Sequence, residues 1–452
     1  RDAVDGKTFA VTNPANGEEI TRVPDGGTSA ARAAIEAAHD AFRTWSKTTA
    51  YDRSRILYRA WELMIEKKEH LARTMTEEQG KPMRASRTEV QYGADYLLWF
   101  AEEAKRIYGE TIPSSRADQR FIIQHQAVGV VAAITPWNYP ISMITRKIGP
   151  ALAAGCTVVL KPAESTPLCA IEMFKIFEEA GVPKGVVNLV TGLDPKPIGD
   201  ELVNNPKVRK LTFTGSTPVG KMLAGAAAAN MKRVSCELGG HAPFLVLPDA
   251  DPVHAAKGVQ LVKMLNTGQA CISPNRIFVH RSIHDTFVET LAGRIGKMKA
   301  GSGFEEGVAI GPLVNEAAVA KVERQVNDAV DKGAKAVTGG ARLTDNGLDK
   351  GNFFAPTVLT GITPAMEIYR EETFGPVAPI IAYDDEDDLL AMANDTHYGL
   401  AAYVYTQNLS QAFRMFEGLD FGIIGINDIN PSGASAPFGG MKDSGLGREG
   451  AR

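Results

Sequence analysis

The spacing of apolar positions changes near residue 127 of the chain. Before that point, apolar side chains recur every three or four residues along 31–46, 50–80 and 88–108, and this period predicts amphipathic helices. The tripeptide Gly80-Lys-Pro82 predicts the end of the second helical stretch. Residues 28–110 are therefore expected to be helical.

After residue 127, short apolar runs alternate with segments of helical spacing. Strands that alternate with helices predict β-α-β units and a parallel sheet, in which ligands bind beyond the carboxyl ends of the strands. The expected strands cover 128–134, 157–161, 186–190 and 210–214, and the expected helices cover 142–154, 167–180, 198–204 and 216–229.

A second series of this kind follows Val234 and predicts a second α/β domain. Residues 119–126 stand apart, because polar and apolar side chains alternate there between the helical region and the first strand. We expect them to form part of a projecting hairpin, whose exposed edge invites pairing with another chain. In the second series the expected strands cover 244–247, 276–280, 336–338, 377–383, 401–405 and 422–427, and a helix covers 253–266.

Composition narrows the class of protein. A chain of 452 residues that is 44% hydrophobic and 23% charged is typical of a globular protein with two or three domains. With 49 Lys+Arg against 53 Asp+Glu, its net charge of -4 provides no bulk basic surface for nucleic acid or an anionic membrane. No apolar stretch approaches the roughly 18 residues of a membrane-spanning helix.

The four cysteines, Cys156, Cys169, Cys236 and Cys271, are widely separated, and none belongs to a C-x-x-C pair. This spacing argues against a zinc ribbon, a thioredoxin-like motif and a disulfide framework. Free thiols in a reducing compartment are the better interpretation. We therefore expect a cytoplasmic protein without a bound metal.

Three residues are candidates for a catalytic site with a covalent intermediate. Cys271 follows a predicted helix and would be a nucleophile as a thiolate, although most cysteines are small packed residues. Glu237 lies between apolar residues and a Gly-Gly turn, where desolvation would raise its pKa toward that of a general base; an exposed loop carboxylate is the alternative. Asn138 follows a strand end, where its amide would donate to an oxyanion or merely cap a turn.

Two further segments suit a nucleotide. Lys161-Pro-Ala-Glu164 ends the second expected strand, where a glutamate can bind the adenosine ribose of NAD, although a solvated ion pair has the same pattern. Residues 213–220 read as a strand, a glycine turn and a helix start, whose free N–H groups form an anion site. Their G-x-x-x-x-G spacing matches neither the dinucleotide fingerprint nor a Walker loop, so it identifies no nucleotide by itself.

Taken together, these segments resemble the aldehyde dehydrogenase superfamily from about residue 11 to residue 450. Seven motifs in the same order make a chance match negligible. They are Thr135-Pro-Trp-Asn138, Lys161-Pro-Ala-Glu164, Phe213-Thr-Gly-Ser216, Glu237-Leu-Gly-Gly240, Gly268-Gln-Ala-Cys271, Glu372-Thr-Phe-Gly-Pro376 and Pro437-Phe-Gly-Gly440.

The resemblance implies an α/β fold in three parts and a homodimer or homotetramer. These parts are a Rossmann-like NAD(P)-binding domain over 1–108 and 128–239, a catalytic domain over 240–440, and an oligomerisation hairpin over 109–127. The C-terminal strand that would complete the oligomerisation arm is not among the 452 residues. We expect both termini to be trimmed.

The resemblance also assigns catalytic roles. Cys271 would attack an aldehyde to give a thiohemiacetal, whose oxyanion the Asn138 side chain and the Cys271 N–H would hold. After hydride transfer to the nicotinamide, Glu237 would activate the water that hydrolyses the thioester, which favours a free acid over transfer to coenzyme A. Lys147 matches a lysine often linked to proton relay.

Other residues match cofactor contacts of the family. Glu164 favours NAD because its charge would repel a 2′-phosphate, although NADP stays possible. Glu372 matches the carboxylate on the nicotinamide ribose, and Phe374 matches the ring beside the nicotinamide. The full set is Thr135, Pro136, Trp137, Lys161, Glu164, Gly215, Ser216, Leu238, Glu372 and Phe374.

Residues 145–147, 149–156 and 444–450 are similar to succinate-semialdehyde dehydrogenases, which suggests that Arg146 binds a substrate carboxylate through a bidentate pair. Such enzymes usually carry a second arginine where this chain has Leu265. They also often carry Cys-x-Cys, whereas this chain has Cys271-Ile-Ser273 without a second thiol. The redox switch of that motif is therefore expected to be absent here. The expected pocket residues are Tyr139, Met143, Arg146, Leu265, Ile272 and Ser432.

Two alternatives stay open. If Arg146 faces away from the substrate, the protein would oxidise neutral aliphatic or aromatic aldehydes with broad specificity. The other alternative is a non-catalytic binding protein on the same fold, and the presence of Cys271, Glu237 and Asn138 argues against it.

Overall fold

Four helices span residues 28–103, within the range predicted to be helical, in the computed structural model, which describes residues 6–452. The predicted stretch 50–80 is divided at Lys67, and Gly80 ends its second helix with a φ of +88°, in the left-handed region that favours glycine. The first five residues of the predicted domain 1–108 lie outside the described part. The helices are α1 (Thr28–Trp45), α2 (Ala50–Glu66), α3 (Lys68–Gln79) and α4 (Met83–Glu103).

The first β-α-β series contains the strands β5 (Val130–Ile134), β6 (Thr157–Lys161), β7 (Val187–Leu189), β8 (Val208–Thr214) and β9 (Arg233–Glu237). Its helices are α5 (Ser142–Ala153), α6 (Pro167–Glu179), α7 (Pro195–Asn204) and α8 (Thr217–Ala229). With β19 (Gly445–Leu446) these strands form a six-stranded sheet in the order β19-β9-β8-β5-β6-β7, parallel except for β19. The carboxyl ends of β5, β6 and β8 therefore meet at one edge, where ligands bind in such sheets.

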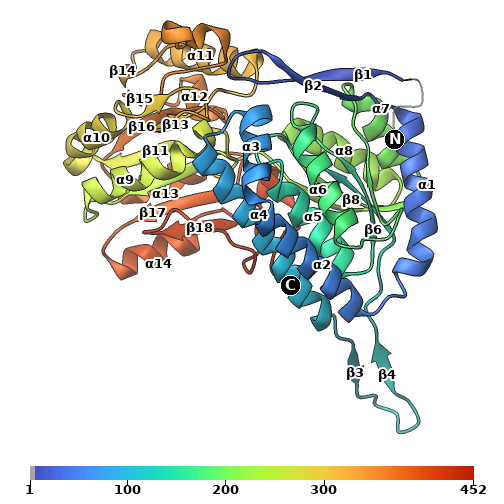
Figure 1. Cartoon of the computed structure of the whole chain (residues 1–452). Helices are drawn as coiled ribbons and strands as arrows, with labels where there is room; N and C mark the ends of the chain where they lie inside the picture. The colour runs from blue at the N-terminus through green and yellow to red at the C-terminus, as the bar shows by residue number, and fades with distance from the viewer. Residues whose placement is uncertain (1–5) are drawn as a thin grey trace.

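The second series forms a seven-stranded sheet from β10 (Ala242–Val246), β11 (Pro274–His280), β14 (Lys335–Thr338), β15 (Thr357–Thr360), β16 (Val377–Tyr383), β17 (Ala401–Tyr405) and β18 (Ile423–Ile426). The order β14-β15-β16-β11-β10-β17-β18 is parallel except for the β14–β15 pair. Its helices are α9 (Pro252–Lys263), α10 (Arg281–Ile295), α11 (Glu316–Asp331), α12 (Glu367–Arg370), α13 (Glu386–Asn394) and α14 (Leu409–Gly418). These yellow to red elements gather beside the blue and green first half of the chain (Figure 1).

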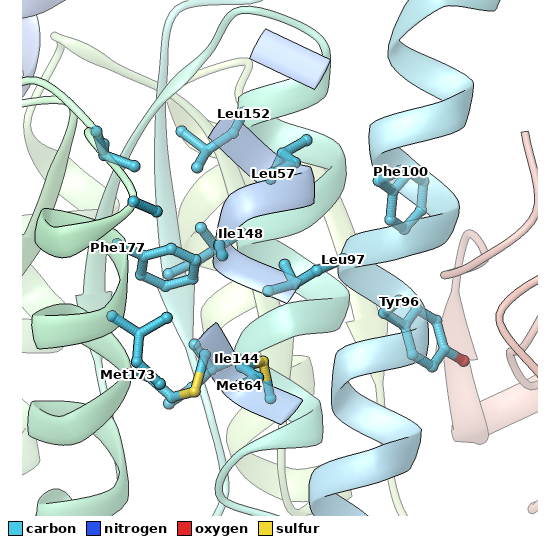
Figure 2. Packing of buried hydrophobic residues seen from close by; sticks show 14 of the residues in the cluster. Leu57, Met64, Tyr96, Leu97, Phe100, Ile144, Ile148, Leu152, Met173 and Phe177 are labelled. Carbon is cyan, nitrogen blue, oxygen red and sulfur yellow. The ribbon is translucent and has the colours of Figure 1, made fainter. Parts of the chain in front are cut away.

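The largest buried apolar cluster joins the N-terminal helices to the first sheet. Figure 2 shows Leu57 and Met64 of α2, Leu97 of α4, and Ile144 and Ile148 of α5 gathered in it. Burying one such side chain contributes about 1.5–3 kcal/mol. The cluster therefore fixes α5, which follows the carboxyl end of β5.

The predicted hairpin is present as β3 (Glu110–Ile112) and β4 (Phe121–Ile123), and it projects from the body of the molecule (Figure 1). The two strands pair antiparallel, with Thr111 opposite Ile122. Ile122 is 81% exposed, and its apolar neighbours Ile112 and Phe121 are exposed as well. A projecting hairpin with apolar side chains in solvent is a candidate surface for contact with another chain.

The sequence pattern does not predict β9, although its last residue is Glu237. Its sequence RVSCE is short and contains only two apolar residues, and the strand pairs with β8 on one side and β19 on the other. Also unpredicted are β1 (Thr8–Thr12), β2 (Glu19–Pro24), β12 (Lys299–Ala300), β13 (Val308–Ile310), β15, β19, and the helices α10 to α14. Within residues 6–452, no helix has the length and apolar character needed to cross a membrane.

Candidate active site

A left-handed turn leads from α9 to Cys271. Residues 266–268 have φ values of +48°, +60° and +76°, a region that is strained for the β-branched Thr267. The Thr267 hydroxyl donates to the Gly311 carbonyl oxygen (3.2 Å) and accepts from the Gly311 amide (3.0 Å). A contact with a distant segment therefore stabilises the turn that presents Cys271.

Cys271 is partly exposed, whereas the other three cysteines are buried. Desolvation of its sulfur raises the pKa of the Cys271 thiol to about 12, and the positive charge of Arg146 acts in the opposite direction. The thiol is therefore protonated at neutral pH in this state. Formation of the nucleophilic thiolate requires a base or a further favourable charge.

Asn138 is buried next to the Cys271 turn, where the chain leaves β5. Its side-chain Nδ2 donates to the carbonyl oxygen of Gln269 (3.0 Å), and its own carbonyl oxygen accepts from Nδ2 of Asn266 (2.9 Å). An amide nitrogen carries two N–H donors, so Asn138 keeps one N–H for another acceptor. The structure thus brings Asn138 and the turn that carries Cys271 into direct contact.

Glu237 ends β9 and is 4% exposed, and its Oε2 makes no hydrogen bond. Burial raises its pKa well above the usual range, and the negative charge of Glu449 raises it further. Three residues later, a side chain added at Gly240 would lie 2.1 Å from the Cys271 carbonyl oxygen. The Glu237-Leu-Gly-Gly240 motif therefore packs directly against the Cys271 backbone.

Glu449 is a buried carboxylate that the sequence analysis did not assign a role. It forms ion pairs with Lys147 Nζ (2.5 Å) and Arg146 Nε (3.1 Å), and its Oε1 accepts from the Thr212 hydroxyl (3.4 Å). Burial would raise the pKa of Glu449, but the charges of Lys147 and Arg146 outweigh burial and hold it below its usual value. Residues 444–450, which contain Glu449, were part of the sequence resemblance. However, 302 residues separate Glu449 from Lys147, so their contact could not be predicted from the sequence.

Arg146, the predicted carboxylate ligand, is 2% exposed and faces several groups besides Glu449. Its guanidinium lies 4.1 Å from the centre of the Phe438 ring and 5.6 Å from that of Tyr96, and its NH1 donates to the Met143 sulfur (3.7 Å). Its NH2 and Nε are both buried without a hydrogen bond, although Nε lies 3.1 Å from Glu449 Oε2 in the ion pair. NH2 is therefore the nitrogen of the guanidinium that has no polar partner.

Two tyrosines missed by the sequence analysis connect predicted pocket residues. The Tyr92 hydroxyl bonds to Ser432 Oγ (3.3 Å) and to the Tyr96 hydroxyl (3.1 Å), and Tyr96 lies beside Arg146. Both tyrosines lie on α4, one helical turn apart. Their i, i+4 spacing was the only signal in the sequence, and the partner Ser432 is 340 residues away.

The remaining predicted pocket residues have separate surroundings. The Leu265 side chain is 37% exposed. The carbonyl oxygen of Ile272 accepts from the Tyr403 hydroxyl (2.9 Å). The hydroxyl of Tyr139 is buried without a hydrogen-bond partner. Within the described residues, only Leu265 of this set presents a large apolar side chain to solvent.

The predicted phosphate turn precedes α8. Ser216 is the N-cap residue of this helix, its side chain makes no capping hydrogen bond, and the Gly215 N–H donates to the Glu237 carbonyl oxygen (3.1 Å). The first N–H groups of a helix without a capping side chain are suited to an anion. Leu238 packs beneath this turn, since a side chain at Gly220 would lie 2.2 Å from it.

The ends of β5 and β6 carry the other groups predicted for a nucleotide. Lys161 Nζ and Glu164 Oε2 form an ion pair of 3.0 Å, in which Lys161 is buried and Glu164 is 39% exposed. The Thr135 N–H donates to the Lys161 carbonyl oxygen (3.1 Å), so the Thr135-Pro136 strand end lies beside Lys161. These residues share one edge of the sheet with Ser216 at the start of α8.

Glu372 and Phe374 lie on a loop that reaches this edge. Glu372 Oε1 accepts from the Gly240 N–H (2.9 Å), and burial raises the pKa of Glu372 to about 7. Phe374 has a φ of +57°, and its ring meets that of Trp137 edge-on at 5.5 Å. Non-glycine residues in this conformation are uncommon and often belong to functional sites. The free N–H groups of α8, the Lys161–Glu164 pair and the Glu372 carboxylate together fit a dinucleotide.

Comparison with known proteins points to one family. A family model described as "Aldehyde dehydrogenase family" matches residues 2–452. A glutarate-semialdehyde dehydrogenase of Pseudomonas putida is 50% identical over 451 residues, which are 100% of this chain and 92% of that protein. The NADP-dependent succinate-semialdehyde dehydrogenase of Escherichia coli has the same identity and coverage.

Solved structures agree with this match. The crystal structure of a succinate-semialdehyde dehydrogenase from Burkholderia pseudomallei superimposes with a TM-score of 0.98 at 48% identity, and covers 100% of this chain and 92% of that one. The resemblance inferred from the seven motifs is confirmed, and so is the predicted α/β fold with a Rossmann-like part.

Proposed function

The chain belongs to the aldehyde dehydrogenase family, and we propose that it oxidises a carboxylate-bearing semialdehyde, such as succinate semialdehyde, to the acid through a thioester on Cys271. As a member of this family it is an NAD(P)-dependent oxidoreductase. The observation that carries the proposed chemistry is the junction of three motifs. The Asn138 amide bonds to the Cys271 turn, and the Glu237 motif packs on the Cys271 carbonyl.

In the first step, the Cys271 sulfur attacks the aldehyde carbon and its proton passes to a base. The carbonyl oxygen then becomes an oxyanion, and the free N–H of Asn138 and the Cys271 N–H are the donors proposed for it. A preorganised donor of this kind is worth about 10²–10³ in rate. Fixing Asn138 on the Cys271 turn supports this role, because the donor does not need to reorganise.

Loss of a hydride from the thiohemiacetal carbon gives the thioester on Cys271, and the nicotinamide cofactor, when bound, would supply the hydride acceptor. In the second half of the reaction, this thioester is hydrolysed. Glu237 takes a proton from water, and the water oxygen attacks the thioester carbon. The bond between this carbon and the Cys271 sulfur then breaks, which releases the acid and restores the cysteine. Two observations support this role: burial raises the pKa of Glu237, and its Oε2 makes no hydrogen bond and can accept a proton.

We propose Arg146 as the cation that recognises the substrate carboxylate. Its buried NH2 without a partner supports this assignment, and the similar proteins of Pseudomonas putida and Escherichia coli are described as semialdehyde dehydrogenases. The ion pair with Glu449 and the apolar Leu265 favour a second candidate, a broad-specificity enzyme for neutral aldehydes. We also keep Tyr139, Met143, Ile272 and Ser432 as proposed pocket residues.

For the cofactor, we propose that NAD is preferred and NADP is accepted. The partly exposed carboxylate of Glu164 would repel a 2′-phosphate, whereas Lys161 beside it partly offsets that charge. Replacing Glu164 with serine is expected to raise kcat/KM for NADP relative to NAD. An unchanged ratio in that variant would contradict the role of Glu164.

We further propose that the protein is cytoplasmic and forms a homo-oligomer. Four free cysteines support a reducing compartment. The exposed apolar residues of the β3–β4 hairpin support an oligomer contact. The predicted boundaries at 108, 127 and 239 remain our proposal for the three parts of the chain.

The proposed function is tested with two aldehydes of equal length, succinate semialdehyde and butanal, by following NADH formation. We expect kcat/KM to be at least about tenfold higher for succinate semialdehyde, since a charge-assisted hydrogen bond contributes about 1.5–3 kcal/mol. Equal values would favour the broad-specificity candidate. The Cys271→Ala variant should form no NADH with either aldehyde, and unchanged turnover in it would refute the covalent mechanism.

A further inference from the structure

A buried lysine–glutamate pair lies behind Asn138. Lys81 belongs to the Gly80-Lys-Pro82 turn after α3, Glu89 lies on α4, and both side chains are 1% exposed. The Lys81 ammonium donates to Glu89 Oε2. Burial of two charges is costly unless each is paired and hydrogen-bonded, so the other contacts of the pair indicate what it holds in place.

The Lys81 ammonium also holds the main chain at Asn138. Its Nζ donates to the Asn138 carbonyl oxygen (2.7 Å), and it lies 4.1 Å from the centre of the Tyr139 ring. The same carbonyl oxygen accepts from Asn266 Nδ2 (2.9 Å). Two donors from distant parts of the chain therefore fix one peptide group, and a cation–π contact fixes the next side chain.

Glu89 holds the other end of the same segment. Its Oε1 accepts from the N–H groups of Ile141 (3.0 Å) and Ser142 (3.2 Å), where α5 begins. A carboxylate at this position satisfies free N–H groups and interacts favourably with the helix dipole. One ion pair therefore fixes the short segment from Asn138 to Ser142 at both ends.

We propose that Lys81, held by Glu89, is a positioning residue that sets the direction of the Asn138 amide toward the reacting carbonyl oxygen. This inference rests on the proposed role of Asn138 as an oxyanion donor. A donor is most effective when the protein fixes its direction before the reaction. Without Lys81, the Asn138 peptide loses one of its two anchors, and the hydrogen bond to the Gln269 carbonyl oxygen is left to orient the side-chain amide on a less firmly held main chain.

The test measures the single-turnover rate of NADH formation at saturating NAD and succinate semialdehyde. We expect Asn138→Ala to lower this rate by about 10²–10³, and Lys81→Met to lower it by at least about tenfold with the KM for NAD within twofold. The rate of the Lys81→Met/Asn138→Ala double variant should lie within twofold of that of Asn138→Ala alone. If Lys81 acts through Asn138, the effects of the two substitutions are not additive.

Three outcomes overturn the inference, and they are distinguishable. A near wild-type rate in Asn138→Ala refutes the proposed role of Asn138 itself. A loss in Asn138→Ala with a wild-type rate in Lys81→Met refutes only the positioning role. A double variant in which the two single losses multiply shows that Lys81 acts independently of Asn138, and this also refutes the positioning role.

Two further variants separate positioning from folding. Lys81→Met/Glu89→Gln removes both charges, so no charge is left buried alone, and the glutamine oxygen still accepts from the start of α5; it should show the same rate loss. The matched control is Lys232→Met, because Lys232 is also buried and donates to the carbonyl oxygens of Asn205 (2.6 Å) and Val208 (2.7 Å). It should lower Tm without lowering the rate, and an equal rate loss would overturn the inference.

Discussion

Glu237 and Glu449 are both buried, yet their pKa values are shifted in opposite directions. Glu237 ends β9 with an Oε2 that has no partner, and burial, followed by the negative charge of Glu449, raises its pKa. Glu449 lies beyond β19 and contacts Lys147 and Arg146, whose charges outweigh burial and lower its pKa. Since both carboxyl groups are buried, the neighbouring charges account for the opposite directions of the two pKa shifts.

This difference separates two uses of a buried carboxylate. An ionised glutamate between two cations stabilises the packing of its segment and is poorly suited to exchanging a proton. A glutamate with a raised pKa and an oxygen that makes no hydrogen bond is better suited to accept a proton. The comparison therefore supports Glu237 as the base of the proposed mechanism and assigns Glu449 to the electrostatic environment of that base.

The largest effect is expected for Glu237→Gln. Removing a general base lowers turnover by about 10²–10⁴-fold, and the thioester on Cys271 should accumulate because its formation does not need this carboxylate. Mass spectrometry of the enzyme mixed with aldehyde and NAD should detect the acyl adduct. Steady-state turnover near that of the wild type would show that Glu237 is not the base. The difference between the two carboxylates would then have no role in catalysis.

Lys147→Met is expected to act mainly on stability. Removing one partner of a buried ion pair costs up to about 3–5 kcal/mol, and the remaining pair with Arg146 keeps the loss below the upper end of this range. Thermal or urea unfolding would measure the loss. The matched control is Lys196→Met, which removes an exposed ion pair with Asp200 and should cost no more than about 1 kcal/mol. Equal losses in the two variants would show that Glu449 gains little from its pairing.

Glu449→Gln is expected to have the smallest effect on turnover, a shift of the pH profile, while the loss of the carboxylate that pairs with Lys147 and Arg146 also lowers Tm. Removing the negative charge of Glu449 lowers the pKa of Glu237, so more of Glu237 is ionised at a given pH and the acidic limb of kcat moves to lower pH. Thr212→Val is the control, because it removes a contact with Glu449 but no charge. A limb that stays in place, or moves equally in the control, would contradict the coupling of the two carboxylates.

Much of the fold follows from short-range pattern. The predicted strands at 157–161, 377–383 and 401–405 have the observed bounds, because continuous apolar runs between turns suit strands buried on both faces. The strand β9 was missed because its residues acquire strand conformation only through pairing with β8 and β19. Its carboxyl end nevertheless carries Glu237, which the Gly-Gly turn and the family motif singled out.

The site was only partly predictable for a related reason. Cys271, Asn138 and Glu237 stand in motifs of a few residues, so the sequence by itself determined the family and the candidate chemistry. Only the tertiary structure decided which charges surround them: Glu449 meets Lys147 from 302 residues away, and Lys81 reaches Asn138 across 57 residues. Electrostatic interactions depend on distance in space and on burial, and the sequence specifies neither until the chain has folded.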